Sequence, residues 1–180
     1  MGCAVELLRE GGDQGLTMRR VAARVPMSLS NLQHYFKTRD ALLIGLVDHY
    51  LLQTAEVARR RLEGMPPGRE RFVALISASL EDPELAPICR VFKDIWALAE
   101  RSPNIKQHLD GYYQSYALAL SDELRSIAPR SSPQRVREAV SLVLPMVEGY
   151  AVTKDALPLD AAAMTRLLCE QVFALLGREG

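Results

Sequence analysis

The 180-residue sequence has few cysteine, histidine and aromatic side chains. Three cysteines, at positions 3, 89 and 169, and three histidines, at 34, 49 and 108, are spread along the chain. Without a Cys-x-x-Cys pair or a Cys/His cluster, a zinc site is not expected, and three scattered cysteines argue against a disulfide framework. We therefore predict no metal, no cofactor and a reducing, cytoplasmic environment.

Long apolar runs are also missing. No stretch approaches the roughly 20 residues needed to span a bilayer, and the first residues lack the basic segment and apolar core of a signal peptide. We expect no membrane association. The formal net charge is zero, which would also argue against a nucleic-acid partner if the charges were evenly spread.

The charges are not evenly spread. No Asp or Glu occurs from Gln14 to Arg39, a window that holds four arginines, one lysine and His34. From Leu46 onward, 16 basic residues are offset by 18 acidic ones. This distribution is typical of a protein that contacts phosphate groups with its N-terminal part only.

The sequence predicts an all-α fold. Apolar residues recur at spacings of three and four, and no segment alternates as a strand does. We expect about nine helices, with a turn at 11–15 and with Ser132 and Asp160 as N-caps. Four short helices are expected before residue 46. The longer ones are expected over roughly 39–63, 69–81, 84–100, 104–128, 133–155 and 160–177, and the first of these begins inside the N-terminal module.

Two short helices joined by a tight turn are predicted between Leu16 and Phe36. Thr17 is suited to cap the first, over 18–25, and Ser28 the second, in which Leu32 faces inward. The outward side chains are polar and suit hydrogen bonds to base edges and phosphates, as in a helix-turn-helix. The predicted DNA-contacting residues are Thr17, Arg19, Ser28, Ser30, Asn31, Gln33, His34, Tyr35 and Lys37.

This stretch resembles the N-terminal domain of TetR-family transcriptional repressors. The resemblance rests on the cap at Thr17, the Val-Ala pair at 21–22, Ser28 after the turn, the aromatic pair at 35–36 and the Leu pair at 42–43. The order Leu-Gln-His-Tyr-Phe at 32–36 is similar to the branch that contains the choline and betaine regulators.

The chain departs from the family pattern at three places. Pro26 replaces the usual turn glycine, so the backbone there must have a φ near −65° and cannot be left-handed. Gln33 stands where a tyrosine is common, and Arg39 replaces the usual lysine but keeps its charge. In addition, the first helix is expected to be a turn or two short and to lack the basic arm of some relatives.

The resemblance implies a helix-turn-helix domain over 1–45 and a larger helical domain over 46–180. The larger domain would bind a small-molecule effector and form a homodimer through the last two helices, which are apolar on most sides. The dimer would bind a palindromic operator in double-stranded DNA. Effector binding would shift the helix over 39–61 and release the repressor from its operator.

Aromatic residues in the larger domain suggest where an effector binds. The spacings 92/96 and 112/116 place each pair on one helix face. Aromatic rings together with a carboxylate can hold a cation, which hints at a quaternary ammonium ligand. The effector-site candidates are Phe92, Trp96, Tyr112, Tyr116 and Glu148, although each of these aromatic residues is as well explained as core.

Two other classes of function stay open at this point. The chain contains no catalytic arrangement of Ser, His and Asp and no glycine-rich phosphate loop, so a small helical enzyme is the weaker alternative. A helical protein-interaction module that does not bind DNA is the other. It stays open because of Pro26 and the short first helix.

Overall fold

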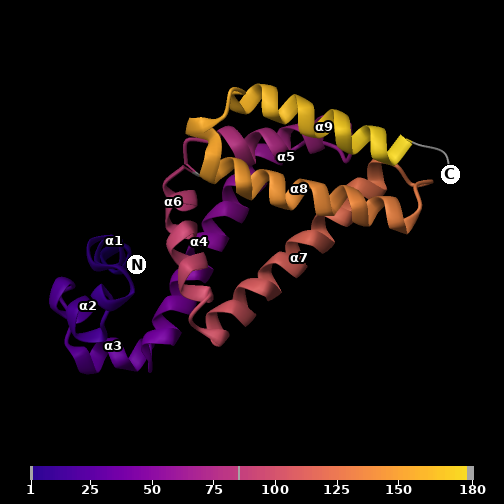
Figure 1. The fold of residues 1–180 in the computed structure, drawn as a ribbon. Helices are drawn as coiled ribbons and strands as arrows, with labels where there is room; N and C mark the ends of the chain where they lie inside the picture. The colour runs from indigo at the N-terminus through magenta and orange to yellow at the C-terminus, as the bar shows by residue number, and fades with distance from the viewer. Residues whose placement is uncertain (1, 85, 178–180) are drawn as a thin grey trace. The chain divides into compact units, whose positions relative to one another are not determined.

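Nine α-helices and one short 3₁₀ helix make up the described chain (Figure 1). The computed structural model describes residues 2–84 and 86–177, without the side chains of residues 9, 13 and 86–92. No strand occurs in these ranges, which confirms the all-α prediction. The helices are α1 (Gly2–Gly15), α2 (Met18–Arg24), α3 (Leu29–Tyr35), α4 (Arg39–Leu62), α5 (Arg69–Glu81), α6 (Ala86–Ala99), α7 (Pro103–Ile127), α8 (Pro133–Thr153), η1 (Lys154–Ala156) and α9 (Ala161–Gly177).

The helix boundaries follow local signals in the sequence. Ser132 Oγ accepts a hydrogen bond from the Arg135 amide at 3.3 Å, and Asp160 Oδ1 accepts one from the Ala163 amide at 2.7 Å. Both predicted N-caps are therefore confirmed. None of the described helices is long and apolar enough to cross a membrane.

The structure breaks the helix where the turn at 11–15 is predicted. Within α1, Gly12 is non-helical, at φ 56° and ψ −152°. Glycine adopts this left-handed φ without a steric penalty, so the chain bends there and then resumes its helix. Gly15 is needed for a different reason, because a Cβ atom at that position would lie 2.7 Å from the carbonyl oxygen of Leu7.

The chain divides into two compact units, each described here by itself. Unit 1 comprises Met1–Thr54 and Arg90–Gly111, and unit 2 comprises Ala55–Cys89 and Tyr112–Gly180. All three boundaries between the units fall within helices, in α4, α6 and α7. A domain boundary near residue 45 stays a prediction.

Unit 1 contains the helix-turn-helix segment. Helix α2 packs against both α1 and α3. Buried leucines also lie in the N-terminal half of α4, and Ile95 of α6 and Ile105 of α7 are buried in the same unit. The largest fully buried side chains of unit 1 are Leu7, Leu16, Leu43, Leu46, Ile95, Ile105 and Val47.

Unit 2 is built around α5, α8 and α9, which lie alongside one another, and the C-terminal half of α7 completes its core (Figure 1). Its center is a cluster of buried apolar residues drawn from all four helices. The cluster consists of Phe72, Ile76, Leu120, Leu124, Val136, Ala139, Val140, Val143, Leu168, Cys169, Val172 and Leu176.

Candidate DNA-binding surface and effector site

The two short helices of the helix-turn-helix begin as their caps predict. Thr17 Oγ1 accepts a hydrogen bond from the Arg20 amide at 3.2 Å, and Ser28 Oγ accepts one from the Asn31 amide at 3.1 Å. Each bond satisfies an amide that the first turn of a helix leaves unpaired. The caps therefore set the start of both helices, and α2 ends at Arg24, one residue before the predicted end.

The turn between α2 and α3 forms without a left-handed residue. The Met27 amide donates to the Val25 carbonyl oxygen at 2.7 Å, which closes a three-residue turn centered on Pro26. An inverse γ-turn of this kind needs a central φ near −75°, a value that proline adopts readily. Within the described residues, every positive φ belongs to a glycine. Pro26 is thus compatible with the motif.

The polar face predicted for this segment is exposed. Val21, Ala22 and Leu32 are buried where α2 and α3 pack. The rings of His34 and Tyr35 lie edge to face, 5.6 Å apart, at the end of α3. All nine predicted DNA-contacting residues are exposed to solvent: Thr17, Arg19, Ser28, Ser30, Asn31, Gln33, His34, Tyr35 and Lys37. Their contact with DNA itself stays a prediction.

Two of the five basic residues in the acid-free window form hydrogen bonds to other groups of the protein. The guanidinium of Arg24 donates two hydrogen bonds to the Glu10 carboxylate, at 2.9 and 2.6 Å, and lies 3.8 Å from Glu6. This pairing lowers the pKa of Glu10. Arg39 Nε donates to the Leu16 carbonyl oxygen at 2.8 Å. The exposed basic side chains that remain in the window are Arg19, Arg20 and Lys37, together with His34.

A second candidate site lies within unit 2, where three tyrosines of α7 approach a glutamate of α8. The Tyr113 hydroxyl donates to Glu148 Oε1 at 3.2 Å. The Tyr112 and Tyr116 rings stack with their centers 6.0 Å apart, and the Tyr112 and Tyr113 rings meet edge to face at 5.3 Å. Ser79 of α5 also lies beside Tyr116, where it partly offsets the rise in the pKa of that tyrosine.

The electrostatics of this cluster are those of a partly buried acid among phenol rings. Burial raises the pKa of Glu148, and the Tyr113 hydrogen bond only partly opposes that rise. Burial likewise raises the pKa values of Tyr112 and Tyr116, and the charge of Glu148 adds to both shifts. Across the described ranges no basic side chain forms an ion pair with this carboxylate. The site can therefore stabilise a cation from outside the chain.

The structure brings together three of the five predicted effector-site residues, namely Tyr112, Tyr116 and Glu148. Trp96 is half-buried in unit 1, and Phe92 belongs to α6 with its side chain outside the described residues. A role for these two in effector binding stays a prediction.

Two further members of the cluster were missed by the sequence analysis. Tyr113 was overlooked because the i, i+4 rule pairs Tyr112 with Tyr116, although Tyr113 is also within three residues of Tyr116. Ser79 is on another helix, 37 positions before Tyr116, and no sequence signal connects the two.

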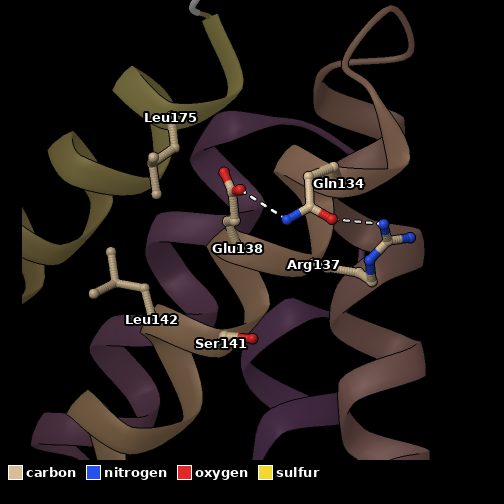
Figure 2. Close-up of a pocket in the computed structure, with 6 residues that line it drawn as sticks. All are labelled: Gln134, Arg137, Glu138, Ser141, Leu142 and Leu175. Carbon is tan, nitrogen blue, oxygen red and sulfur yellow. Dashed lines mark hydrogen bonds between the residues drawn. The ribbon is translucent and has the colours of Figure 1, made fainter.

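The outer side of α8 carries an open groove that reaches α9 (Figure 2). At the polar end of the groove, the Gln134 side chain bonds to two neighbours. It donates to Glu138 at 2.9 Å and accepts from Arg137 at 2.6 Å. Leu142 and Leu175 line its apolar part, and Ser141 completes the lining. The groove is far too open to enclose a small molecule, so it is a surface feature of the last two helices.

The chain matches known regulators over most of its length. Residues 67–177 match the family model described as the C-terminal domain of BetI-type transcriptional repressors. An HTH-type transcriptional regulator in the dhlA 5′ region of Xanthobacter autotrophicus is 36% identical over 174 residues, which are 94% of this chain and 85% of that protein. The HTH-type transcriptional regulator BetI of Burkholderia mallei is 28% identical over 172 residues, or 93% of this chain and 86% of that protein.

Solved structures share the fold. A transcriptional regulator from Rhodococcus sp. RHA1 superposes with a TM-score of 0.75 at 20% identity, covering 97% of this chain and 92% of that one. A regulator from Saccharomonospora viridis, crystallised in complex with choline, has a TM-score of 0.75 at 15% identity and covers 96% and 92%. Neither the interaction-module nor the enzyme alternative is favoured by these matches. The chain belongs to the TetR family of DNA-binding transcriptional regulators, and its C-terminal part is of the BetI type.

Proposed function

We propose that this regulator is a repressor that a small organic cation releases from a palindromic operator. The observation that carries the proposal is the exposed, acid-free surface formed by α2 and α3. Asn31, Gln33 and His34 offer hydrogen bonds to base edges in the major groove. Arg19, Arg20 and Lys37 supply positive charge for the phosphates beside them.

The effector site is proposed to be the cluster of three tyrosines and Glu148. A quaternary ammonium group cannot donate a hydrogen bond, so aromatic faces and one carboxylate are the groups that bind it. The stacked Tyr112 and Tyr116 rings and the unpaired charge of Glu148 provide both. Choline, which is bound in the Saccharomonospora regulator, is the first compound to test.

A homodimer is proposed through α8 and α9. Ser141, Pro145 and Gly149 are exposed at successive i, i+4 positions of α8, and their small size lets another helix approach closely. On α9, Leu167 is 39% exposed and shares its face with Gln171 and Ala174. In the proposed dimer, a second copy related by a two-fold axis packs its α8 and α9 against these faces and covers the groove of Figure 2.

Dimerisation also meets a requirement of DNA recognition. One seven-residue recognition helix reads few base pairs, so two half-sites about one helical turn apart are needed for a specific operator. Helix α4 runs from unit 1 into unit 2 and is the proposed route from effector to operator. The effector must bind the conformation that does not bind DNA more tightly.

The test is fluorescence anisotropy of a labelled duplex from upstream of the protein's own gene. We expect binding at micromolar protein or below that weakens steeply with salt, as phosphate contacts require. Choline is expected to weaken binding at constant ionic strength, with sodium chloride as the matched control. If the protein shows no salt-sensitive binding to the duplex, the repressor proposal is overturned. If it binds the duplex equally well with and without choline, only the effector assignment is overturned.

A further inference from the structure

The cations of the acid-free window do not share one role. Arg39 is the first residue of α4, and its Nε donates to the carbonyl oxygen of Leu16 at 2.8 Å, 23 residues earlier in the chain. Leu16 is fully buried and lies between the end of α1 and Thr17, the N-cap of α2. This hydrogen bond therefore connects the start of α4 directly to the start of the helix-turn-helix.

We propose that Arg39 is a positioning residue that couples α4 to the helix-turn-helix, rather than a contact to operator phosphate. The inference rests on the proposed function, since it names the contact through which a movement of α4 reaches α2. If α4 shifts along its axis, the bond to Leu16 moves the residue that precedes the α2 cap. The orientation of α2 and α3 then changes with that of α4.

The packing around Arg39 makes the coupling stiff. Thr38 Oγ1 accepts a hydrogen bond from the Ala41 amide at 3.0 Å and thus caps α4 one residue before Arg39. Leu42, Leu43 and Leu46 follow on the buried side of the helix, each at most 2% exposed. The guanidinium consequently extends from a fixed backbone, and a displacement of the first turn of α4 is transmitted rather than absorbed by a loose side chain.

Arg19 and Arg24 provide the two contrasting cases for a test. Arg19 is exposed on α2 and is a proposed phosphate contact, whereas Arg24 is held by Glu10 and Glu6 within the protein. A residue that binds phosphate contributes about one unit to the slope of log affinity against log salt, and a residue that binds inside the protein contributes nothing. The slope therefore separates the two roles.

The experiment compares Arg19→Gln, Arg24→Gln and Arg39→Gln with the wild type on the upstream duplex and on an unrelated duplex of equal length. We expect Arg39→Gln to keep the wild-type salt slope on both duplexes, as Arg24→Gln does, while Arg19→Gln reduces it by about one. Thermal unfolding is expected at a lower temperature for Arg39→Gln than for the wild type, and unchanged for Arg19→Gln. Arg39→Lys, which keeps the charge, checks that the result does not depend on one substitution.

Coupling is read from the ratio of operator affinities without and with choline. If Arg39 had a merely structural role, Arg39→Gln would lower both affinities equally and their ratio would stay at the wild-type value. The proposal instead requires that the ratio move toward one in Arg39→Gln. Arg24→Gln should keep the wild-type ratio. A slope reduced by about one in Arg39→Gln, or a wild-type ratio, would overturn the proposal. If the wild type binds neither duplex at low salt, the repressor function itself fails and the coupling role fails with it.

Discussion

Glu148 is the single residue on which the effector proposal depends most. Its carboxylate accepts a hydrogen bond from Tyr113 and interacts electrostatically with Tyr112 and Tyr116, and its pKa is raised because burial disfavours the charged form. A cation that enters the cluster would act as a charged partner for the ionised acid and so offset the cost of burying its charge. The carboxylate thus provides the charge, and the phenol rings provide the shape.

Replacing Glu148 with glutamine tests this division. Glu148→Gln keeps the shape and a hydrogen-bonding oxygen but removes the charge. Choline affinity should therefore fall by about tenfold or more, because two opposite charges about 4 Å apart near a protein surface attract by about 4 kcal/mol. Isothermal titration calorimetry measures the affinity. Glu170→Gln, on the exposed side of α9, is the matched control and should bind choline as the wild type does.

The raised pKa of Glu148 also predicts how choline binding responds to pH. An acid whose pKa lies above its ordinary 4.5 becomes neutral while the pH is still above that value. The neutral acid attracts a cation less, so choline affinity should decrease as the pH is lowered through the raised pKa. Titrations at a series of pH values should show this decrease in the wild type, and a flat profile in Glu148→Gln. The same decrease in both proteins would contradict the role of Glu148.

Asn31 is the residue expected to read operator sequence. It is exposed in the first turn of α3, and an amide side chain can form two hydrogen bonds to adenine. Asn31→Ala should weaken operator binding by about 1–3 kcal/mol and leave binding to an unrelated duplex unchanged. Competition binding measures both affinities. An equal loss on the two duplexes would indicate a phosphate contact instead.

At the scale of the element, α1 depends on one glycine for its packing. A Cβ at Gly15 would lie 2.7 Å from the Leu7 carbonyl oxygen, a separation that side-chain carbons do not adopt. Gly15→Ala should therefore reduce the free energy of unfolding by about 1–3 kcal/mol, the usual cost of forced overpacking. Urea denaturation measures the change.

Gly111 of α7 is the matched control for Gly15. A Cβ at Gly111 meets no atom within 4 Å, and its backbone φ is negative. Alanine there should leave stability unchanged or raise it by up to about 1 kcal/mol, because it favours the helix. If the two alanine variants had the same stability, the close approach at Gly15 would not be a real constraint.

The helices were largely predictable from the sequence because their ends are set by neighbouring residues. Thr17, Ser28, Ser132 and Asp160 each cap a helix through the amide three positions later, so the signal and its effect are close together in the chain. The break inside α1 was predictable for the same reason, because successive glycines favour a turn and Gly12 has the positive φ that glycine allows. The close approach of Gly15 to the Leu7 carbonyl oxygen was not predictable, since it depends on how the two parts of α1 pack.

The contacts that build the sites were much less predictable. Tyr113 meets Glu148 across 35 residues, Arg39 meets Leu16 across 23, and Arg24 meets Glu10 across 14. Such pairs depend on how helices pack, and no periodicity in the sequence encodes them. The count of basic residues in the acid-free window therefore indicated a DNA-binding surface without showing that two of them are engaged within the protein.

At the scale of the whole molecule, the account requires a dimer. Gly149 lies at the end of the exposed small-residue stripe on α8, where a bulky side chain would block a second copy. Gly149→Trp should convert a dimer to a monomer in sedimentation equilibrium and should abolish specific operator binding. Gln114→Trp, at an exposed position of α7, should remain dimeric. A dimeric Gly149→Trp protein would place the interface elsewhere.

Release from the operator requires that effector binding move the two recognition helices of one dimer relative to each other. The most direct measurement is the distance between spin labels at Ala23→Cys in both copies, with the three native cysteines replaced. Ala23 is exposed on α2 and is not a proposed DNA contact. Two half-sites one DNA turn apart hold the recognition helices about 34–36 Å apart, so the labels should report one fixed distance on operator DNA. With saturating choline and no DNA, a different distance is expected. An unchanged distance while calorimetry shows choline bound would contradict this movement.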